Sequence, residues 1–286
     1  MMRYGDLWRK LEPVYGEREA QAVVRTVLDD GFGLSLAEVL SGGMDGVDGD
    51  RLRSVMQRLM AGEPVQYVLG RARFRDRMFG VKPGVLIPRP ETGELCQWVI
   101  DEETGKRNKE SGNEPLELLD VGTGSGCIAV SLALEMDGAQ VAAIDVSPDA
   151  LAIARDNAQQ LGAQVDFRLA DILADDGEWP GERRFDIIVS NPPYICLKEQ
   201  KAMARNVVAY EPHLALFVPD DNPLLFYRAI ARKTRRWLKP GGRLYFEINP
   251  PYARRLRAML KEEGFDNCRM RRDSFGKMRM ARAILQ

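Results

Sequence analysis

Histidine is nearly absent from this chain, which has one, His213, among its 286 residues. A histidine-based nucleophilic triad or a histidine-rich zinc site is therefore hard to assemble, and we expect no metal centre. The four cysteines lie far apart without a C-x-x-C pair, which favours reduced, mostly buried thiols over disulfides. The sequence also lacks a secretory leader pattern and any apolar run of about 18 residues. We expect a cytoplasmic protein without membrane contact.

The chain also has no large excess of positive or negative charge. The 41 basic and 42 acidic residues leave a net charge of −1, which gives no general attraction to nucleic acid. We therefore expect no direct nucleic-acid binding. The length exceeds that of one average domain and predicts two.

The first part of the chain has helical periodicity. Ala20, Val23, Val24 and Val27 recur at three- and four-residue spacing, and Ser35 with Glu38 has the form of a capping box. Residues 1–64 are predicted to form a helical domain. Residues 65–88 alternate with period two and predict a β-hairpin linker.

The hairpin segment carries four arginines at alternate positions, Arg71, Arg73, Arg75 and Arg77. An extended strand would place all four on one face. They form either a solvated face or a docking surface for an acidic partner. Further on, the polar residues 101–115 predict a loop.

Strands and helices alternate in the remainder, residues 89–286. Strands are expected at 116–121, 141–145, 165–170, 185–190, 243–248 and 279–285, with another possible at 267–272. Helices are expected at 126–136, 148–161, 222–238 and 251–263. Such alternation indicates an α/β fold, a mostly parallel sheet covered by helices on both faces.

A glycine-rich turn follows the first of these strands. A turn of this kind brings backbone N–H groups close to a ligand at the carboxyl end of a strand, although it is also compatible with a tight turn that binds nothing. The next two strands also end in acids: Asp145 can accept both ribose hydroxyls, and Asp171 can meet an adenine amino group while Ile172 packs on the ring. The combination argues for S-adenosylmethionine rather than a dinucleotide. The candidate cofactor-binding residues of the turn are Asp120, Gly122, Thr123, Gly124, Ser125 and Gly126.

A second motif, Asn191-Pro192-Pro193-Tyr194, follows the fourth strand. The side-chain oxygen of Asn191 and the backbone carbonyl of Pro192 can accept hydrogen bonds from an NH₂ group, and Tyr194 can lie against a planar amide or base. The two prolines stiffen the loop and remove competing N–H donors. We expect all four residues to bind the substrate, Asn191, Pro192 and Tyr194 to act in catalysis, and Asn191 to face the cofactor too. Together the two motifs indicate methyl transfer to a weakly nucleophilic nitrogen.

These motifs belong to a longer resemblance that runs from about Gly62 to Ala283. It includes the segments Glu63–Gly70, Leu86–Thr92, Asp120–Gly126, Asp145–Pro148 and Ser190–Tyr194. The chain resembles the HemK-type methyltransferases, which modify the glutamine of the Gly-Gly-Gln loop in peptide chain release factors. The resemblance implies an N-terminal helical domain, here residues 1–64, that recognises the substrate, a hairpin linker and a seven-stranded class I methyltransferase domain. It also implies S-adenosylmethionine as cofactor and release factors as protein substrates. Separately, we expect a monomer.

Two segments depart from the family pattern, residues 217–223 and a second Asn-Pro-Pro-Tyr at 249–252. The second motif follows the fifth strand, away from the expected target position. Methylation of a ribosomal-protein glutamine, methylation of an exocyclic nucleobase amine and a non-catalytic binding module remain as alternatives. The absence of a large basic segment after Tyr194 argues against duplex DNA as substrate.

Overall fold

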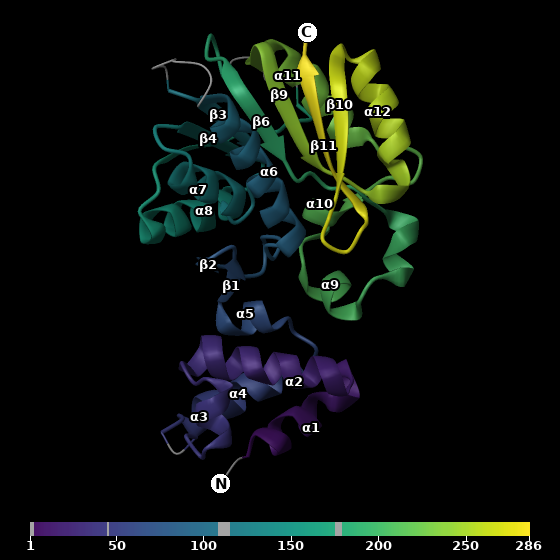
Figure 1. Ribbon diagram of the computed structural model, residues 1–286. Helices are drawn as coiled ribbons and strands as arrows, with labels where there is room; N and C mark the ends of the chain where they lie inside the picture. Colours follow the sequence, from purple (N-terminus) through teal and green to yellow (C-terminus); the bar gives the residue numbers. More distant parts are fainter. Residues whose placement is uncertain (1–2, 45, 108–114, 175–178) are drawn as a thin grey trace.

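The N-terminal helices pack around a core of their own in the computed structural model, which describes residues 3–44, 46–107, 115–174 and 179–286. They form the purple bundle at one end of the molecule in Figure 1. Its core includes Leu7, Leu11, Leu28 and Leu59, all nearly inaccessible to solvent. The predicted capping box is confirmed, because Glu38 N–H donates to Ser35 Oγ and Ser35 N–H donates to the Glu38 carboxylate. The elements are α1 (Tyr4–Tyr15), α2 (Glu17–Thr26), the π-helical turn η1 (Val27–Gly31), α3 (Leu36–Leu40) and α4 (Gly49–Met60).

The linker is a helical turn followed by a short hairpin. Helix α5 (Val65–Leu69) precedes strands β1 (Arg71–Phe74) and β2 (Arg77–Gly80), which pair antiparallel. The prediction of a hairpin from residue 65 onward was therefore wrong over 65–69. Gly70 ends the turn in the left-handed conformation, with φ of 71°, and so separates the helix from the strand.

The hairpin arginines do not share one exposed face. Arg75 lies in the turn with φ of 52°, which breaks the alternation that the sequence suggested. Its guanidinium donates to both oxygens of Glu135, at 3.0 and 2.6 Å, and Arg77 contacts the same carboxylate. Arg73 pairs with Asp30 at 2.8 Å. Three of the four arginines therefore pair with acids of the chain itself, while Arg71 and Arg73 remain exposed, and docking of an acidic partner stays an open alternative.

A seven-stranded sheet forms the centre of the larger domain, with strand order β10-β11-β9-β6-β3-β4-β5. Strands β9, β6, β3, β4 and β5 are parallel, and β11 runs antiparallel to both neighbours. The chain fills one side of β3 first and then crosses to the other, so β3 lies at the point where the strand order reverses. The strands are β3 (Glu117–Val121), β4 (Gln140–Asp145), β5 (Val165–Leu169), β6 (Phe185–Ser190), β9 (Leu238–Glu247), β10 (Phe265–Arg272) and β11 (Met278–Leu285).

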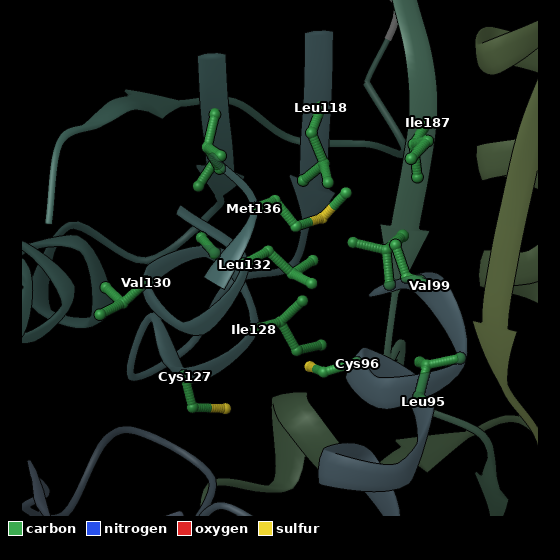
Figure 2. Close-up of a cluster of buried hydrophobic side chains, with 14 of the residues drawn as sticks. Leu95, Cys96, Val99, Leu118, Cys127, Ile128, Val130, Leu132, Met136 and Ile187 are labelled. Carbon is green, nitrogen blue, oxygen red and sulfur yellow. The ribbon is translucent and has the colours of Figure 1, made fainter. Parts of the chain in front are cut away.

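Helices cover both faces of this sheet. Adjacent residues Leu118 and Leu119 of β3 enter opposite cores, as the alternation of a strand requires. One core is packed against α6 (Pro90–Arg107), α7 (Cys127–Glu135) and α8 (Pro148–Leu161), the other against α11 (Leu225–Trp237) and α12 (Ala253–Glu262). Figure 2 shows side chains of α6, α7, β3 and β6 in the first core. This is the class I methyltransferase fold expected from the sequence.

Helix α6 extends further than the sequence suggested. Residues 101–107 are helical rather than part of a loop, while residues 108–114 of that predicted loop lie outside the described residues. Glu103 of α6 is buried and pairs with Arg243 of β9 at 2.6 Å, and Glu102 accepts a hydrogen bond from the Tyr245 hydroxyl. Tertiary partners therefore stabilise this polar end of the helix.

A compact insert lies between β6 and α11 and was not predicted. It contains β7 (Ile195–Cys196), the 3₁₀ turn η2 (Leu197–Ala202), α9 (Arg205–Tyr210), α10 (His213–Leu216) and β8 (Phe217–Val218). The Tyr210 hydroxyl donates to the carbonyl of Ala61 at 3.1 Å, so the insert touches the N-terminal helices (Figure 1). A second 3₁₀ turn, η3 (Pro250–Tyr252), follows β9. Within the described part of the chain, no helix combines the length and the apolar character needed to cross a bilayer.

Candidate active site

A cavity of about 320 Å³ lies beside β3 at the carboxyl ends of the parallel strands. Open α/β sheets bind ligands at such a point of strand-order reversal. The walls come from the ends of β3, β4 and β6, the linker after the hairpin, and α10 and α11. We call it the cofactor cavity; it is lined among others by Leu86, Gly122, Gly124, Asp145, Asp171, Ile172, Asn191, Pro192, Pro193, Leu214, Ala215 and Phe226.

The glycine turn exposes its backbone to this cavity. Gly122 and Gly124 have φ of 74° and 56°, and a Cβ added at either would meet open space. Gly126 has a different role, because a Cβ there would lie 3.0 Å from the Cβ of Ala154 on α8. The turn is tied to β4 by hydrogen bonds from the N–H groups of Gly122 and Thr123 to the Ile144 carbonyl. The motif therefore combines backbone approach with close helix packing, as a nucleoside site needs.

Asp120, Thr123, Ser125 and Gly126 lie behind the turn and do not line the cavity. The Oδ2 atom of Asp120 accepts hydrogen bonds from Thr123 Oγ1 at 2.7 Å and from Ala129 N–H at 3.2 Å. Its Oδ1 atom is buried without a partner, and burial raises the pKa of this carboxyl to about 7. A role of Asp120, Thr123, Ser125 and Gly126 in cofactor binding stays a prediction. In the structure these four residues help to hold the turn.

The raised pKa of Asp120 makes a prediction about stability. In the unfolded chain the carboxyl ionises near pH 4, but in the folded protein it ionises near pH 7. The native state is therefore penalised progressively as the pH rises from about 4 to about 7, and the penalty stays constant above that. Asp120→Asn keeps an oxygen acceptor and removes the charge. We expect the variant to melt at a higher temperature than the parent at pH 8, with a smaller difference at pH 5. Equal differences at both pH values would contradict the buried charge.

Asp145 presents its carboxylate to the cofactor cavity. Gly124 N–H donates to Oδ2 at 2.8 Å and Ser147 N–H donates to Oδ1 at 2.9 Å, which leaves further lone pairs on both oxygens. Burial raises the pKa of this group, and the backbone N–H donors oppose that shift. Asp171 and Ile172 lie in the same wall. A carboxylate with free acceptors, exposed backbone and apolar walls fits the ribose and base of S-adenosylmethionine.

A second cavity of about 220 Å³ adjoins the first, and we call it the target cavity. The two share Leu86, Asn191, Pro192 and Ala215 as wall residues. Pro193 lines only the cofactor cavity, whereas Tyr194 lines only the target cavity. Asn191 and Pro192 thus stand where the two spaces meet.

Asn191 and Pro192, which line both cavities, each have a carbonyl oxygen that can accept hydrogen bonds. The Nδ2 group of Asn191 donates to Thr92 Oγ1 at 3.1 Å. Among the described residues, no group donates to Asn191 Oδ1 or to the Pro192 carbonyl. The Tyr194 hydroxyl donates to Glu247 at 2.9 Å, and burial raises its pKa well above the usual range, so it stays protonated. The geometry gives two unpaired carbonyl acceptors beside an aromatic ring.

Sequence reasoning missed several residues of the site. Thr92 and Glu247 are buried and contact the motif, although they lie 99 and 53 residues from the partners they hold, Asn191 and Tyr194. Thr92 ends one of the quoted family segments, but no local pattern indicates its contact with Asn191.

The second Asn-Pro-Pro-Tyr contacts the first motif and the strand that follows it. Asn249 is 7% exposed and donates to the carbonyl of Tyr194 at 3.1 Å. The Tyr252 hydroxyl lies 3.1 Å from the sulfur of Cys196. Through these contacts the second motif holds the first motif and β7, the strand that follows it. The expectation that the second motif lies away from the target position agrees with its absence from both cavity walls.

Known proteins resemble this chain in sequence or in fold. A family described as methyltransferase domain matches residues 113–267. The release factor glutamine methyltransferase of Bacteroides thetaiotaomicron is 42% identical over 278 residues, covering 96% of both chains. The enzyme of the same name from Flavobacterium psychrophilum is 40% identical and covers 94% of this chain and 93% of its own.

A solved structure agrees in fold. The 16S rRNA N2 methyltransferase of T. thermophilus, solved with AdoMet and guanosine, superposes with a TM-score of 0.53 at 20% identity. It matches 76% of this chain and 50% of its own length. At this identity the likeness concerns the fold alone. The sequence matches go further, because they extend over the helical part, the linker and both cavities: this chain belongs to the release factor glutamine methyltransferases.

Proposed function

We propose that the protein transfers a methyl group from S-adenosylmethionine to the side-chain amide nitrogen of the glutamine in the Gly-Gly-Gln motif of peptide chain release factors. The observation that carries this proposal is the junction of the two cavities at Asn191 and Pro192. A cofactor in one cavity and an amide in the other would meet at this junction. The relatives that share this chain's length carry the same name.

The residues of the junction bind and orient an amide group. An amide nitrogen is a poor nucleophile because its lone pair is delocalised into the carbonyl. The free acceptors on Asn191 Oδ1 and the Pro192 carbonyl take one N–H bond each, which turns the lone pair toward the cofactor cavity. Tyr194, buried and held by Glu247, provides a flat wall for the amide plane.

The cofactor site fits S-adenosylmethionine through residues of three strand ends. Asp145 would bind the ribose hydroxyls, Asp171 and Ile172 the adenine, and the Gly122–Gly124 backbone the remaining part. When bound, S-adenosylmethionine supplies a methyl group activated by a positively charged sulfur. The protein therefore needs no strong base, and no group of metal-binding side chains occurs among the described residues.

The helical domain and the linker are proposed to take part in substrate recognition. The boundaries 1–64, 65–88 and 89–286 stay predictions, as does a monomeric state. Two contacts support a role of the helical domain and the linker in substrate recognition. Tyr210 of the insert hydrogen-bonds to Ala61. The linker packs on α8 through Tyr67, Val85 and Ile153. The helical domain thus lies next to the insert that carries part of the target cavity wall (Figure 1).

Mass spectrometry of a release factor incubated with the protein and S-adenosylmethionine tests the proposed function. We expect the Gly-Gly-Gln peptide to gain the mass of one methylene group, because a methyl replaces a hydrogen. A release factor with asparagine in place of that glutamine is the control and should remain unmodified. Methyl incorporation into a ribosomal protein or into nucleic acid, with none in the release factor, would contradict the proposal. Absence of S-adenosylmethionine binding in calorimetry would instead favour a non-catalytic module.

A further inference from the structure

Two consecutive hydrogen bonds, one buried and one partly buried, lead from β9 to the junction of the two cavities. Glu247, 2% exposed at the end of β9, accepts a hydrogen bond from Thr92 Oγ1 at 2.6 Å. Thr92, also 2% exposed, in turn accepts a hydrogen bond from Asn191 Nδ2 at 3.1 Å. The three residues come from β9, α6 and the loop after β6, and only the folded sheet brings them together.

The number of protons on each group determines which partner donates in each of these hydrogen bonds. The hydroxyl of Thr92 has a single proton, which it donates to Glu247 Oε2, so toward Asn191 it can only accept. Asn191 must then turn its NH₂ group to Thr92 and its Oδ1 atom to the junction. The opposite orientation would place an NH₂ group against the NH₂ group of the target, two donors facing each other.

An ionised Glu247 carboxylate maintains this order of donors and acceptors. Its two oxygens receive hydroxyl protons from Thr92 and Tyr194, which is the arrangement of an ionised carboxylate. Burial raises the pKa of Glu247, whereas these hydroxyls and the positive charge of Arg279 on β11 lower it. The other ionisable groups around it come from the start of α6, from α7 and from α11, namely Arg89, Glu91, Cys127 and Tyr227.

We propose that Glu247 and Thr92 are positioning residues that orient the Asn191 carboxamide so that its oxygen faces the target nitrogen. This inference rests on the proposed function. It explains why two buried polar residues that are far from the motif in sequence contact it in the folded protein. It also implies selection for a target that donates two N–H bonds. A glutamate side chain, whose carboxylate can only accept, would meet Asn191 Oδ1 and the Pro192 carbonyl with repulsion.

Thr92→Val tests the proposal, since valine has nearly the shape of threonine and lacks the hydroxyl. The variant leaves Asn191 without its acceptor, and the carboxamide can take either orientation. We expect kcat for release factor methylation to fall on the order of 10- to 100-fold, with the Kd of S-adenosylmethionine within about threefold of the parent. Thr92→Ser keeps the hydroxyl and should restore kcat to within about twofold of the parent.

A matched control separates orientation from general loss of a buried hydroxyl. Thr234 on α11 is fully buried, and its hydroxyl donates to the Ala231 carbonyl at 3.1 Å, far in sequence from either motif. Thr234→Val should lower thermal stability to a similar degree and leave kcat unchanged. A Thr92→Val enzyme with parental kcat, or a Thr92→Ser enzyme as slow as Thr92→Val, would overturn the proposal. If the parent itself fails to methylate release factors, the proposed function fails instead.

The pH profile adds a readout that packing alone would not change. Protonation of Glu247 allows it to donate to Thr92, which reverses this order of donors and acceptors and turns the Asn191 NH₂ group to the junction. We expect kcat of the parent to fall on acidification with an inflection above the usual glutamate range. Glu247→Gln should be slower and should lack this inflection. An inflection that persists unchanged in the Glu247→Gln variant would contradict the role of Glu247.

Discussion

Replacing Asn191 by alanine should reduce kcat for release factor methylation at least about 100-fold while leaving S-adenosylmethionine bound. The substitution removes Oδ1, one of the two free acceptors at the junction of the cavities, and leaves the glycine turn and Asp145 in place. The target amide can still enter the target cavity, but its lone pair is no longer directed at the cofactor. Single-turnover methylation measured beside calorimetric titration of the cofactor separates the two effects.

Asn222→Ala is the matched control for this experiment. Asn222 is exposed and lines neither cavity, so the same chemical change there should leave both kcat and cofactor affinity at parental values. An Asn191→Ala enzyme with normal turnover would refute the orientation mechanism. A parallel loss of cofactor binding would show that Asn191 acts mainly through the cofactor cavity, which it also lines.

The central sheet could be predicted because its strands have a strong local signal. Strands β3, β4 and β6 are short apolar runs bounded by turn residues, which is typical of parallel strands buried on both faces. Their sequence order with the intervening helices then indicated the crevice at β3. The positions of Asp145 and Asn191 in the walls of that crevice follow from their places just after strand ends.

Other features depend on partners distant in sequence and left no local pattern. Glu102 and Glu103 continue α6 through an apparently loop-like stretch because β9 supplies Tyr245 and Arg243 as partners. The strands of the insert have two residues each, too short for any periodicity. Arg75 adopts a positive φ that sequence rules reserve for glycine or asparagine, so the single strand suggested by the alternation of arginines is broken by a turn at residue 75.

The hydrogen bonds that connect Glu247, Thr92 and Asn191 are the clearest example of contacts without a local sequence pattern. Thr92 and Glu247 are 155 residues apart, and both were visible in the sequence without any indication that they meet. The sequence therefore indicated the groups that we propose bind the target amide, whereas the fold was needed to see which residues contact those groups. Catalytic motifs are local, but the residues that position them are set by tertiary packing.

Asp145→Asn should weaken S-adenosylmethionine binding on the order of 100-fold. In the parent, both carboxylate oxygens already accept a backbone N–H, from Gly124 and Ser147, and retain capacity for the ribose hydroxyls. The amide turns one of these acceptors into a donor that faces a backbone N–H, and it removes the charge that strengthens the remaining bonds. A loss of about 3 kcal/mol corresponds to the expected change in Kd.

Asp149→Asn is the control for Asp145→Asn, because Asp149 lies four residues further along, is exposed and lines neither cavity. Calorimetric titration should give the parental Kd for this variant. With saturating cofactor, Asp145→Asn should recover much of the parental kcat, since Asn191 and its supporting residues are unchanged. Parental affinity in Asp145→Asn would contradict the ribose assignment and move the nucleoside away from the end of β4. A low kcat that saturating cofactor does not restore would mean that the Gly124 turn, which Asp145 holds, also positions the methyl group for transfer.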